Sequence, residues 1–312
     1  MKPSISVIIA AHNAEAFLWE TLASLQRQRF TDYEIILVDD GSTDNTRAIA
    51  TRPHCRIIAL PRSGVSIARN AGLAAARAPY VLFLDADDVM PPDALGHLVE
   101  ALDGCPAAVA AVGQHLKFWP DQTESFDAPL RRGIEMPDKN SLKALLRRNF
   151  IVNGGSLLIR TNLARMTGGF NTQLRLGEDW DFWCRLALLG DFVVLRETIV
   201  LHYRQRLEGA QNALRGTPFR INDEAVIAIF SDPHIRARFS RHELWLSRRR
   251  ARQDAFWSEA RAHLLRRHYI SFALYLGFGF IRFPETLFKL GQLKRYWNGA
   301  ETALEALRQA RR

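Results

Sequence analysis

The sequence predicts an α/β fold in which a mostly parallel sheet is covered by helices. Apolar runs of strand length recur along the chain, segments with helical spacing separate them, and acidic residues directly follow two of the runs. Strands that alternate with helices in this way favour a parallel sheet with helices on both faces. The 312 residues, 47% hydrophobic and 24% charged, suffice for one large core or for a catalytic domain with an appendage.

The first half of the chain alternates regularly. Mostly apolar runs predict buried strands at 4–11, 35–38, 56–60, 80–84 and 107–112. Helical spacing and start signals predict helices at 14–29, 43–50, 63–76 and from the pair Pro91 and Pro92 onward. Ser42 or Thr43 is the expected cap of the second helix, because a short hydroxyl side chain accepts hydrogen bonds from the first helical N–H groups.

The alternation weakens after residue 114. Residues 117–140 contain several Pro, Asp and Gly and predict a loop or hairpin that reaches over the site. Regular structure is expected again at 149–159, as a helix over 178–189 and as strands over 192–203.

Acidic residues cluster in three places, at 39–40, 85–88 and 178–181. The first two clusters follow predicted strands, and ligands of open α/β sheets bind beyond the carboxyl ends of the strands. Asp85 and Asp87 offer hard oxygens to Mg²⁺ or Mn²⁺, and such a cation suits a diphosphate. Turn formation or helix capping explains any single cluster. Three clusters in this order predict a site for a metal-nucleotide.

Six motifs occur in a fixed order, at residues 6–13, 33–46, 64–72, 83–88, 168–170 and 177–185. They resemble the family 2 glycosyltransferases of the GT-A fold, over about residues 4–204. The resemblance implies an inverting transfer of a sugar from a nucleotide-diphospho-sugar, a UDP-sugar being favoured, to an acceptor hydroxyl, assisted by Mn²⁺ or Mg²⁺. A catalytic domain is expected at 1–206 and a helical tail at 207–312.

The resemblance assigns the nucleotide site to several residues. Asp40 and the backbone near Ala10 contact the base, and Arg69 lies near the nucleotide, where its planar donor fork suits a phosphate or a base carbonyl. A solvated arginine on an amphipathic helix is the alternative for Arg69. Ala10 and His12 stand where relatives often have Pro and Tyr, which leaves the identity of the base open.

The same resemblance assigns the cation and ribose contacts to the residues after the fourth strand. Asp87 binds the cation directly, whereas Asp85 holds the ribose or reaches the cation through water, and Ala86 between them contacts the nucleotide. The cation neutralises the leaving diphosphate. Asp88 is expected to cap the turn toward Pro91.

Asp179 matches the general base of the family, which takes the proton of the acceptor hydroxyl. Its neighbours Glu178 and Asp181 are expected to raise its pKa by like-charge repulsion. The alternative is that these acidic residues only favour the positive end of a helix, and it is the preferred explanation for Asp181. Trp180 and Trp183 are expected in the core.

A further position departs from the family. Many relatives carry a histidine three residues after the tyrosine that matches Tyr203, and here that position is Arg206. An arginine neutralises a diphosphate directly, so metal dependence is expected to be weaker. Glu178 and Arg206 are therefore candidate contacts to the diphosphate or the acceptor. His202 is expected to point into the sheet.

The tail carries the positive charge of the chain. Residues 236–312 contain 17 Lys and Arg against 6 Asp and Glu, and the whole chain has a net charge of +9. Residues 241–267 predict a basic helix, and 269–281 form an uncharged aromatic run. This run is shorter than the roughly 20 residues of a spanning helix, which favours an interfacial anchor on an anionic membrane. A helical hairpin on the catalytic domain or a homodimer interface is the alternative, and nucleic-acid binding is not expected.

Three isolated cysteines and the lack of a charged-then-apolar leader predict a cytoplasmic protein, peripheral on the inner face of the membrane. The expected role is assembly of bacterial cell-surface polysaccharide on a glycan or lipid-linked acceptor. A sugar nucleotidyltransferase is one alternative, but it needs a glycine-rich loop after the first strand, and residues 10–15 contain no glycine. A non-catalytic nucleotide- or membrane-binding domain is another, and the presence of Asp85, Asp87 and Asp179 argues against it.

Overall fold

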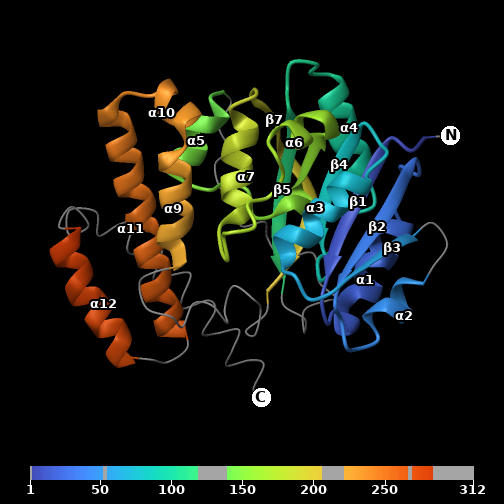
Figure 1. The fold of residues 1–312 in the computed structure, drawn as a ribbon, viewed down its shortest axis with the longest axis horizontal. Helices are drawn as coiled ribbons and strands as arrows, with labels where there is room; N and C mark the ends of the chain where they lie inside the picture. Colours follow the sequence, from blue (N-terminus) through green and yellow to red (C-terminus); the bar gives the residue numbers. More distant parts are fainter. Residues whose placement is uncertain (1, 52–54, 119–138, 206–220, 266–268, 284–312) are drawn as a thin grey trace.

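A computed structural model of the chain describes residues 2–51, 55–118, 139–205, 221–265 and 269–283. Its centre is a seven-stranded sheet in the order β3-β2-β1-β4-β6-β5-β7 (Figure 1). The strands are β1 (Ile5–Ala11), β2 (Tyr33–Asp40), β3 (Cys55–Leu60), β4 (Tyr80–Asp85), β5 (Ala110–Phe118), β6 (Leu157–Arg160) and β7 (Phe192–Arg204). Within the described residues, β6 runs antiparallel to β4 and β5, and the other strand pairs are parallel. The expected mostly parallel sheet is confirmed.

Helices cover both faces of the sheet, and the two faces hold separate clusters of buried apolar side chains. One face is covered by α1 (Glu15–Gln26), α2 (Thr46–Ala50) and α4 (Ala94–Asp103). The other is covered by α3 (Val65–Ala75), α5 (Ser141–Arg147), α6 (Thr161–Met166) and α7 (Glu178–Ala187). Because strand side chains alternate between the faces, each strand of the sheet contributes to both clusters, and the central strands β1 and β4 are buried on both sides.

Several boundaries differ from the sequence-based expectation. The second helix begins at Thr46 instead of 43, because Asp44 Oδ1 accepts from the Thr46 amide and Ser42 Oγ accepts from the Asn13 amide. The expected cap at Ser42 or Thr43 is therefore wrong. The fourth helix begins at Ala94, after the proline pair. β5 continues to Phe118, and most of the loop expected at 117–140 lies outside the described residues.

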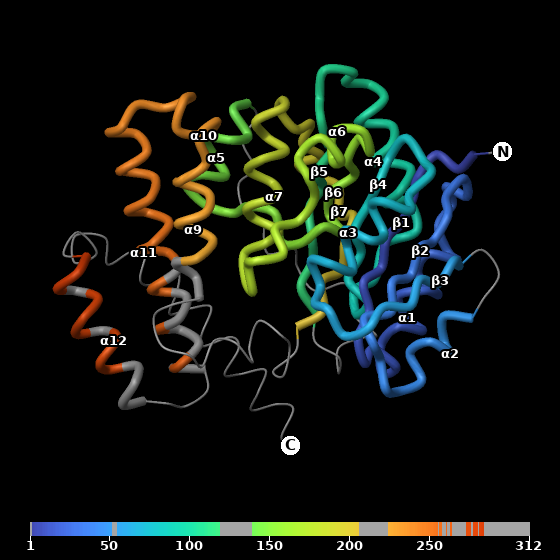
Figure 2. Tube along the Cα trace, in the orientation of Figure 1, coloured from blue at the N-terminus to red at the C-terminus, as the bar shows by residue number. Residues whose placement is uncertain are grey.

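The described helices after residue 220 form a group beside α5 and α7 (Figure 1). They are α9 (Ile221–Ser231), α10 (Pro233–Arg238), α11 (Arg241–Leu265) and α12 (Tyr269–Arg282). Val226 and Ile229 of α9 share a buried cluster with Phe182 and Trp183 of α7. The side-by-side course of α9 and α7 is visible in the trace (Figure 2). The expected domain boundary at 206–207 lies outside the described residues, so that division stays a prediction.

The aromatic run expected in the tail forms α12, which packs against α11. Phe256, Trp257, Ala260, Tyr275 and Phe283 make a small buried cluster between them. This is the helical pairing named as an alternative, although one face of α12 remains exposed. Among the described residues, none of the helices combines the length and the apolar character that crossing a bilayer requires.

Candidate active site

The carboxyl ends of β1, β2 and β4 lie at one edge of the sheet. Ala10 on β1 is paired with Val38 on β2 and with Asp85 on β4, so Asp40 and Asp85 end neighbouring strands close to Ala10. Bound ligands of open α/β sheets lie at such an edge. The structure therefore brings together the expected base contacts and the first aspartate of the expected cation site.

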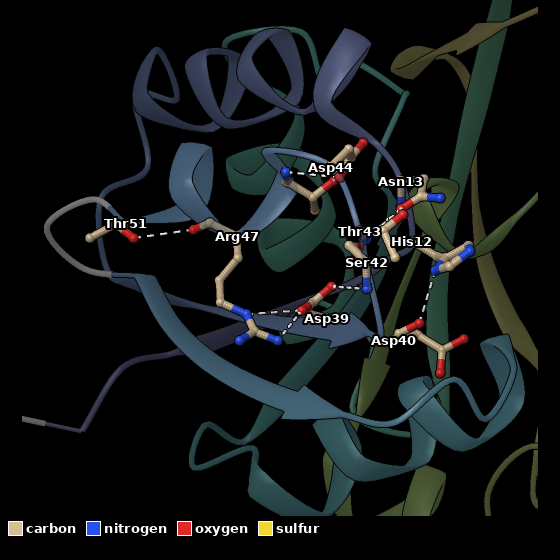
Figure 3. Close-up of polar contacts among 10 residues, drawn as sticks. His12, Asn13, Asp39, Asp40, Ser42, Thr43, Asp44, Arg47 and Thr51 are labelled. Atoms are coloured by element: carbon tan, nitrogen blue, oxygen red, sulfur yellow. Dashed lines mark hydrogen bonds and ion pairs between the residues drawn. The ribbon is translucent and has the colours of Figure 1, made fainter.

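Asp39 and Asp40 have different surroundings (Figure 3). Asp39 points toward Arg47, whose Nη2 donates to Asp39 Oδ2 over 2.7 Å, and it also accepts from the Ser42 amide. Burial pushes the pKa of Asp39 up, but the hydrogen bonds from Ser42 and Arg47 outweigh burial and hold the pKa below its ordinary value. Asp39 is thus a structural anion that fixes the loop after β2.

Asp40 points away from Asp39, and it is almost fully buried. Its carboxylate accepts from the amides of Ser63 (2.6 Å) and Gly64 (3.0 Å) and is paired with Arg62. The backbone oxygen of Asp40 contacts His12 Nδ1 over 2.9 Å. Asp40 thus ties β2 to the start of α3 and lies next to His12 at the strand edge.

Arg69 connects the second acidic cluster to the third. Its guanidinium is buried, with Nη2 donating to Asp85 Oδ1 over 2.8 Å and Nη1 donating to Glu178 Oε1 over 2.9 Å. Burial alone would lower the pKa of Arg69, but the charges of Asp85 and Glu178 raise it, so the cation is permanent. The alternative of a solvated arginine is wrong. Arg69 holds the end of β4 against the first turn of α7, although these elements are far apart in the sequence.

Asp88 does not cap the turn toward Pro91, and that expectation is wrong. Asp88 is fully buried, its Oδ1 accepts from the Arg204 amide over 2.8 Å, and its Oδ2 accepts from Asn153 Nδ2 over 2.5 Å. Burial raises the pKa of Asp88, and the charges of Asp87 and Asp85 raise it further. Asp88 therefore ties the turn that follows β4 to β7, the strand at one edge of the sheet.

Asp179 lies in the first turn of α7, half-buried, beside Glu178. Burial raises the pKa of Asp179 to about 7, and the charge of Glu178 adds to the rise while Arg69 opposes it. A carboxylate with this pKa exchanges a proton near neutral pH, as a general base must. Asp181, in the same turn, is engaged by Arg185 Nη2 over 2.7 Å. The expected rise of the Asp179 pKa is confirmed in direction, but burial is the larger cause, and Asp85 instead of Asp181 is the second acidic residue that raises it.

The expected core positions of the two tryptophans are borne out in part. Trp183 is fully buried, whereas Trp180 is half-buried and its Nε1 donates to the Leu145 backbone oxygen over 2.9 Å. His202 on β7 is half-buried, and burial lowers its pKa to about 4, so it is neutral at pH 7. Arg206 lies outside the described residues, so its contact to the diphosphate stays a prediction.

The sequence of this chain matches known proteins. The model of "Glycosyl transferase family 2" matches residues 6–160. An uncharacterized glycosyltransferase of Nostoc sp. is 30% identical over 230 residues, which are 71% of this chain and 70% of that protein. The chain belongs to glycosyltransferase family 2. It is also similar to the chondroitin synthase of Pasteurella multocida, 25% identical over 223 residues, which are 68% of this chain but 22% of that protein.

Solved structures support the GT-A fold of this glycosyltransferase. S. aureus TarS 1-349 in complex with UDP-GlcNAc superposes with a TM-score of 0.56 at 20% identity, covering 84% of this chain and 81% of that chain. The mannosyltransferase PcManGT of Pyrobaculum calidifontis, in complex with GDP-Man and Mn²⁺, superposes with a TM-score of 0.55 at 18% identity, covering 90% and 84%. At these identities the likeness shows the fold alone.

The carboxylates at the strand edge of this glycosyltransferase fit a divalent cation that also binds a substrate phosphate. Asp85 and Asp87 are half-buried carboxylates at the strand edge. Among the described residues, no group of three or more His, Cys, Asp or Glu is arranged to hold an ion by itself. Mg²⁺ and related hard cations are typically bound by one or two carboxylates together with substrate phosphates.

Two further residues of the site are not evident from the sequence. Asn153 precedes the 3₁₀ turn Gly154–Ser156 and contacts two aspartates of the second acidic cluster. Arg204 ends β7 and contacts the backbone of Asp87 in that cluster. An asparagine before two glycines indicates a turn but not its partners. Arg204 ends a strand that also contains Arg196, Glu197 and His202, so nothing in the sequence marks it as a buried residue.

Proposed function

We propose that this glycosyltransferase moves a sugar from a nucleotide-diphospho-sugar, a UDP-sugar being favoured, to a hydroxyl of a glycan or lipid-linked acceptor, with inversion at the anomeric carbon. The observation that carries the proposal is the bridge made by Arg69 between Asp85 and Glu178. It sets the turn expected to hold the donor diphosphate beside Asp179, the residue with the properties of a general base.

In the proposed reaction the nucleotide lies along the strand edge, with its base near Ala10, His12 and Asp40 and its ribose near Asp85 and Ala86. Asp87 is the residue expected to hold a divalent cation, Mn²⁺ or Mg²⁺, which neutralises the charge of the departing diphosphate. The presence of Mn²⁺ in the complex of the structurally similar mannosyltransferase supports the choice of cation. Arg69 stays a cation and offsets part of the negative charge of Asp85 and Glu178.

Asp179 acts on the acceptor. A carboxylate oxygen of Asp179 takes the proton of the acceptor hydroxyl while the hydroxyl oxygen forms its bond to the anomeric carbon. The bond from that carbon to the diphosphate oxygen breaks on the opposite face, and the nucleoside diphosphate leaves with the electron pair. A single displacement of this kind inverts the configuration. The raised pKa of Asp179, about 7, makes it a stronger base than an ordinary carboxylate.

The place of the enzyme in polysaccharide assembly rests on its relatives. The names of similar proteins include a chondroitin synthase and a teichoic acid poly(glycerol phosphate) polymerase. We therefore place the enzyme in the assembly of bacterial cell-surface polysaccharide. Glu178 Oε1 accepts from Arg69 over 2.9 Å, so we assign Glu178 to positioning and leave the acceptor contacts to Asp179 and its surroundings.

A donor screen tests the proposal. The purified enzyme is incubated with UDP-, GDP- and other nucleotide-sugars with and without Mn²⁺, and thermal stabilisation and release of the free nucleotide are measured. We expect one donor to stabilise the protein in Mn²⁺ and to be hydrolysed slowly, and an NMR spectrum of the first sugar released to show the inverted anomer. Release of the retained anomer would overturn the inverting mechanism, and no response to any nucleotide-sugar would overturn the proposal itself.

We also propose that α12 lies on an anionic membrane surface. Leu274 and Ile281 are 69% and 80% exposed on the side of α12 opposite Tyr275, which packs on α11. Arg249 and Arg282 lie against the ring of Phe283 at the end of this helix, with ring distances of 5.7 and 5.9 Å. Apolar side chains bordered by arginine are typical of helices that lie in the headgroup region of anionic bilayers.

A pair of charge substitutions tests the membrane contact. Leu274→Asp with Ile281→Asp, which adds two negative charges, is compared with Met166→Asp, a control that adds one at a residue 66% exposed on α6. We expect the double variant to lose sedimentation with phosphatidylglycerol liposomes, which the control keeps, and both variants to retain nucleotide-sugar hydrolysis. Loss of a dimer in light scattering, without any liposome binding by the wild type, would assign the exposed face to a second copy instead.

A further inference from the structure

The side chain of Asn153 contacts the acidic turn after β4, which we define as residues 85–88. Its Nδ2 donates to Asp85 Oδ2 over 3.0 Å and to Asp88 Oδ2 over 2.5 Å, and its Oδ1 accepts from the Gly155 amide over 3.0 Å. An amide nitrogen carries two hydrogens and an amide oxygen accepts. Both hydrogens of Nδ2 of the buried Asn153 are therefore used, and the Gly155 contact fixes which end of the amide faces the two carboxylates.

The contact of Asn153 completes the engagement of Asp85. Asp85 Oδ1 accepts from Arg69, and Asp85 Oδ2 accepts from Asn153. Both oxygens of Asp85 are thus oriented by groups that lie outside the turn. The proposed function places direct cation binding at Asp87 and the water-mediated or ribose role at Asp85, and Arg69 and Asn153 orient the Asp85 carboxylate for that role.

The backbone of the turn is held from the other side by Arg204. Arg204 Nε donates to the Asp87 backbone oxygen over 2.7 Å, and its amide donates to Asp88 Oδ1 over 2.8 Å. The guanidinium is clamped between the rings of Phe17 and Phe118 at 4.8 and 4.6 Å. Residues from α1, β5 and β7 therefore fix the main chain on which Asp87 stands, while Asn153 fixes the flanking carboxylates.

We propose that Asn153 is a positioning residue for the divalent cation: by donating to Asp85 and Asp88 together, it sets the geometry in which Asp87 and the donor diphosphate take the ion. The inference rests on the proposed function. Two carboxylates joined by one neutral donor are kept at a fixed separation without adding a positive charge that would compete with the cation. Groups that orient metal ligands typically contribute about 10- to 100-fold to metal affinity.

The test compares Asn153→Ala, Asn153→Ser and Asn153→Asp with Asn149→Ala, a control four residues away whose Oδ1 accepts from the Ile151 amide. Binding of Mn²⁺ is measured by electron paramagnetic resonance in the presence of UDP, and the unfolding temperature of each variant is measured without ligand. We expect the Ala variant to weaken Mn²⁺ binding by about 10- to 100-fold, the Ser variant, which keeps one donor, to weaken it less, and the Asp variant to weaken it most.

A second readout separates positioning from a loss of fold. If Asn153 positions the ion, saturating Mn²⁺ returns the turnover of the Ala variant to within a few-fold of the wild type, and the Mn²⁺ concentration for half-maximal rate rises. Equal Mn²⁺ affinity in the Ala variant and the Asn149→Ala control would overturn the inference. A lowered unfolding temperature with unchanged Mn²⁺ affinity would also overturn it. Failure of the wild type to bind Mn²⁺ with any nucleotide would instead count against the proposed function.

Discussion

The pH dependence of the reaction follows from the position of Asp179. Its pKa of about 7 arises mainly from burial, with Glu178 as the second cause. The base must be ionised to accept a proton, so kcat/KM should fall about tenfold for each pH unit below 7. At pH 6 about one-tenth of the enzyme is active. An ordinary aspartate, with a pKa near 3.9, would give a flat profile over this range.

The assay is the initial rate of nucleotide release from pH 5 to 8 with donor and acceptor present. In Asp179→Asn we expect turnover to fall by roughly two to four orders of magnitude and the acid limb to disappear from the residual rate. Asp181→Asn is the matched control, because Asp181 belongs to the same helical turn but is paired with Arg185. A flat wild-type profile from pH 5 to 8, or an unchanged limb in Asp179→Asn, would refute the assignment of the base.

Three substitutions should change the stability of the protein or the pH dependence of the reaction. Because the folded pKa of Asp179 is raised, its contribution to stability is fully present below about pH 4 and is lost as the pH rises through about 7; Asp179→Asn should therefore unfold at a higher temperature than the wild type at pH 8 and show no such gain at pH 4. Glu178→Gln removes a charge that raises the pKa of Asp179, so the acid limb of its pH profile should move to lower pH, and an unmoved limb would contradict the coupling. Gly154→Ala would bring a Cβ to 2.6 Å from the Phe83 backbone oxygen and should lower the free energy of unfolding by about 1–3 kcal/mol, whereas Gly277→Ala, with no atom within 4 Å of the added Cβ, should not; equal denaturation midpoints would contradict the packing.

Much of the fold could be predicted because its signals are local. Runs such as Tyr80–Leu84 are apolar on both faces, and the strands that they form are buried on both faces. The start of α2 could not be predicted, since Ser42 and Thr43 both have the chemistry of a cap. Ser42 instead accepts from Asn13, which is distant in the sequence, and this contact delays the helix to Thr46.

The candidate site also has residues that the sequence predicts and contacts that it does not predict. Asp85, Asp87 and Asp179 stand in motifs that can be recognised in the sequence, and the structure brings the first and last of them to one network through Arg69. Asp88 was assigned to the wrong partner because its true partners, Asn153 and Arg204, come from remote segments. Tertiary contacts of this kind leave no periodic pattern in the chain.

In the proposed function, the acidic turn after β4 holds a nucleoside diphosphate through a divalent cation bound by Asp87. Calorimetric titration of UDP into the wild type and into Asp87→Ala, each with and without Mn²⁺, tests this binding mode. Asp87→Ala withdraws a hard oxygen ligand, so we predict that Mn²⁺ strengthens UDP binding to the wild type and that this gain is absent in the variant. Equal titration of UDP by both proteins in Mn²⁺ would contradict this binding mode.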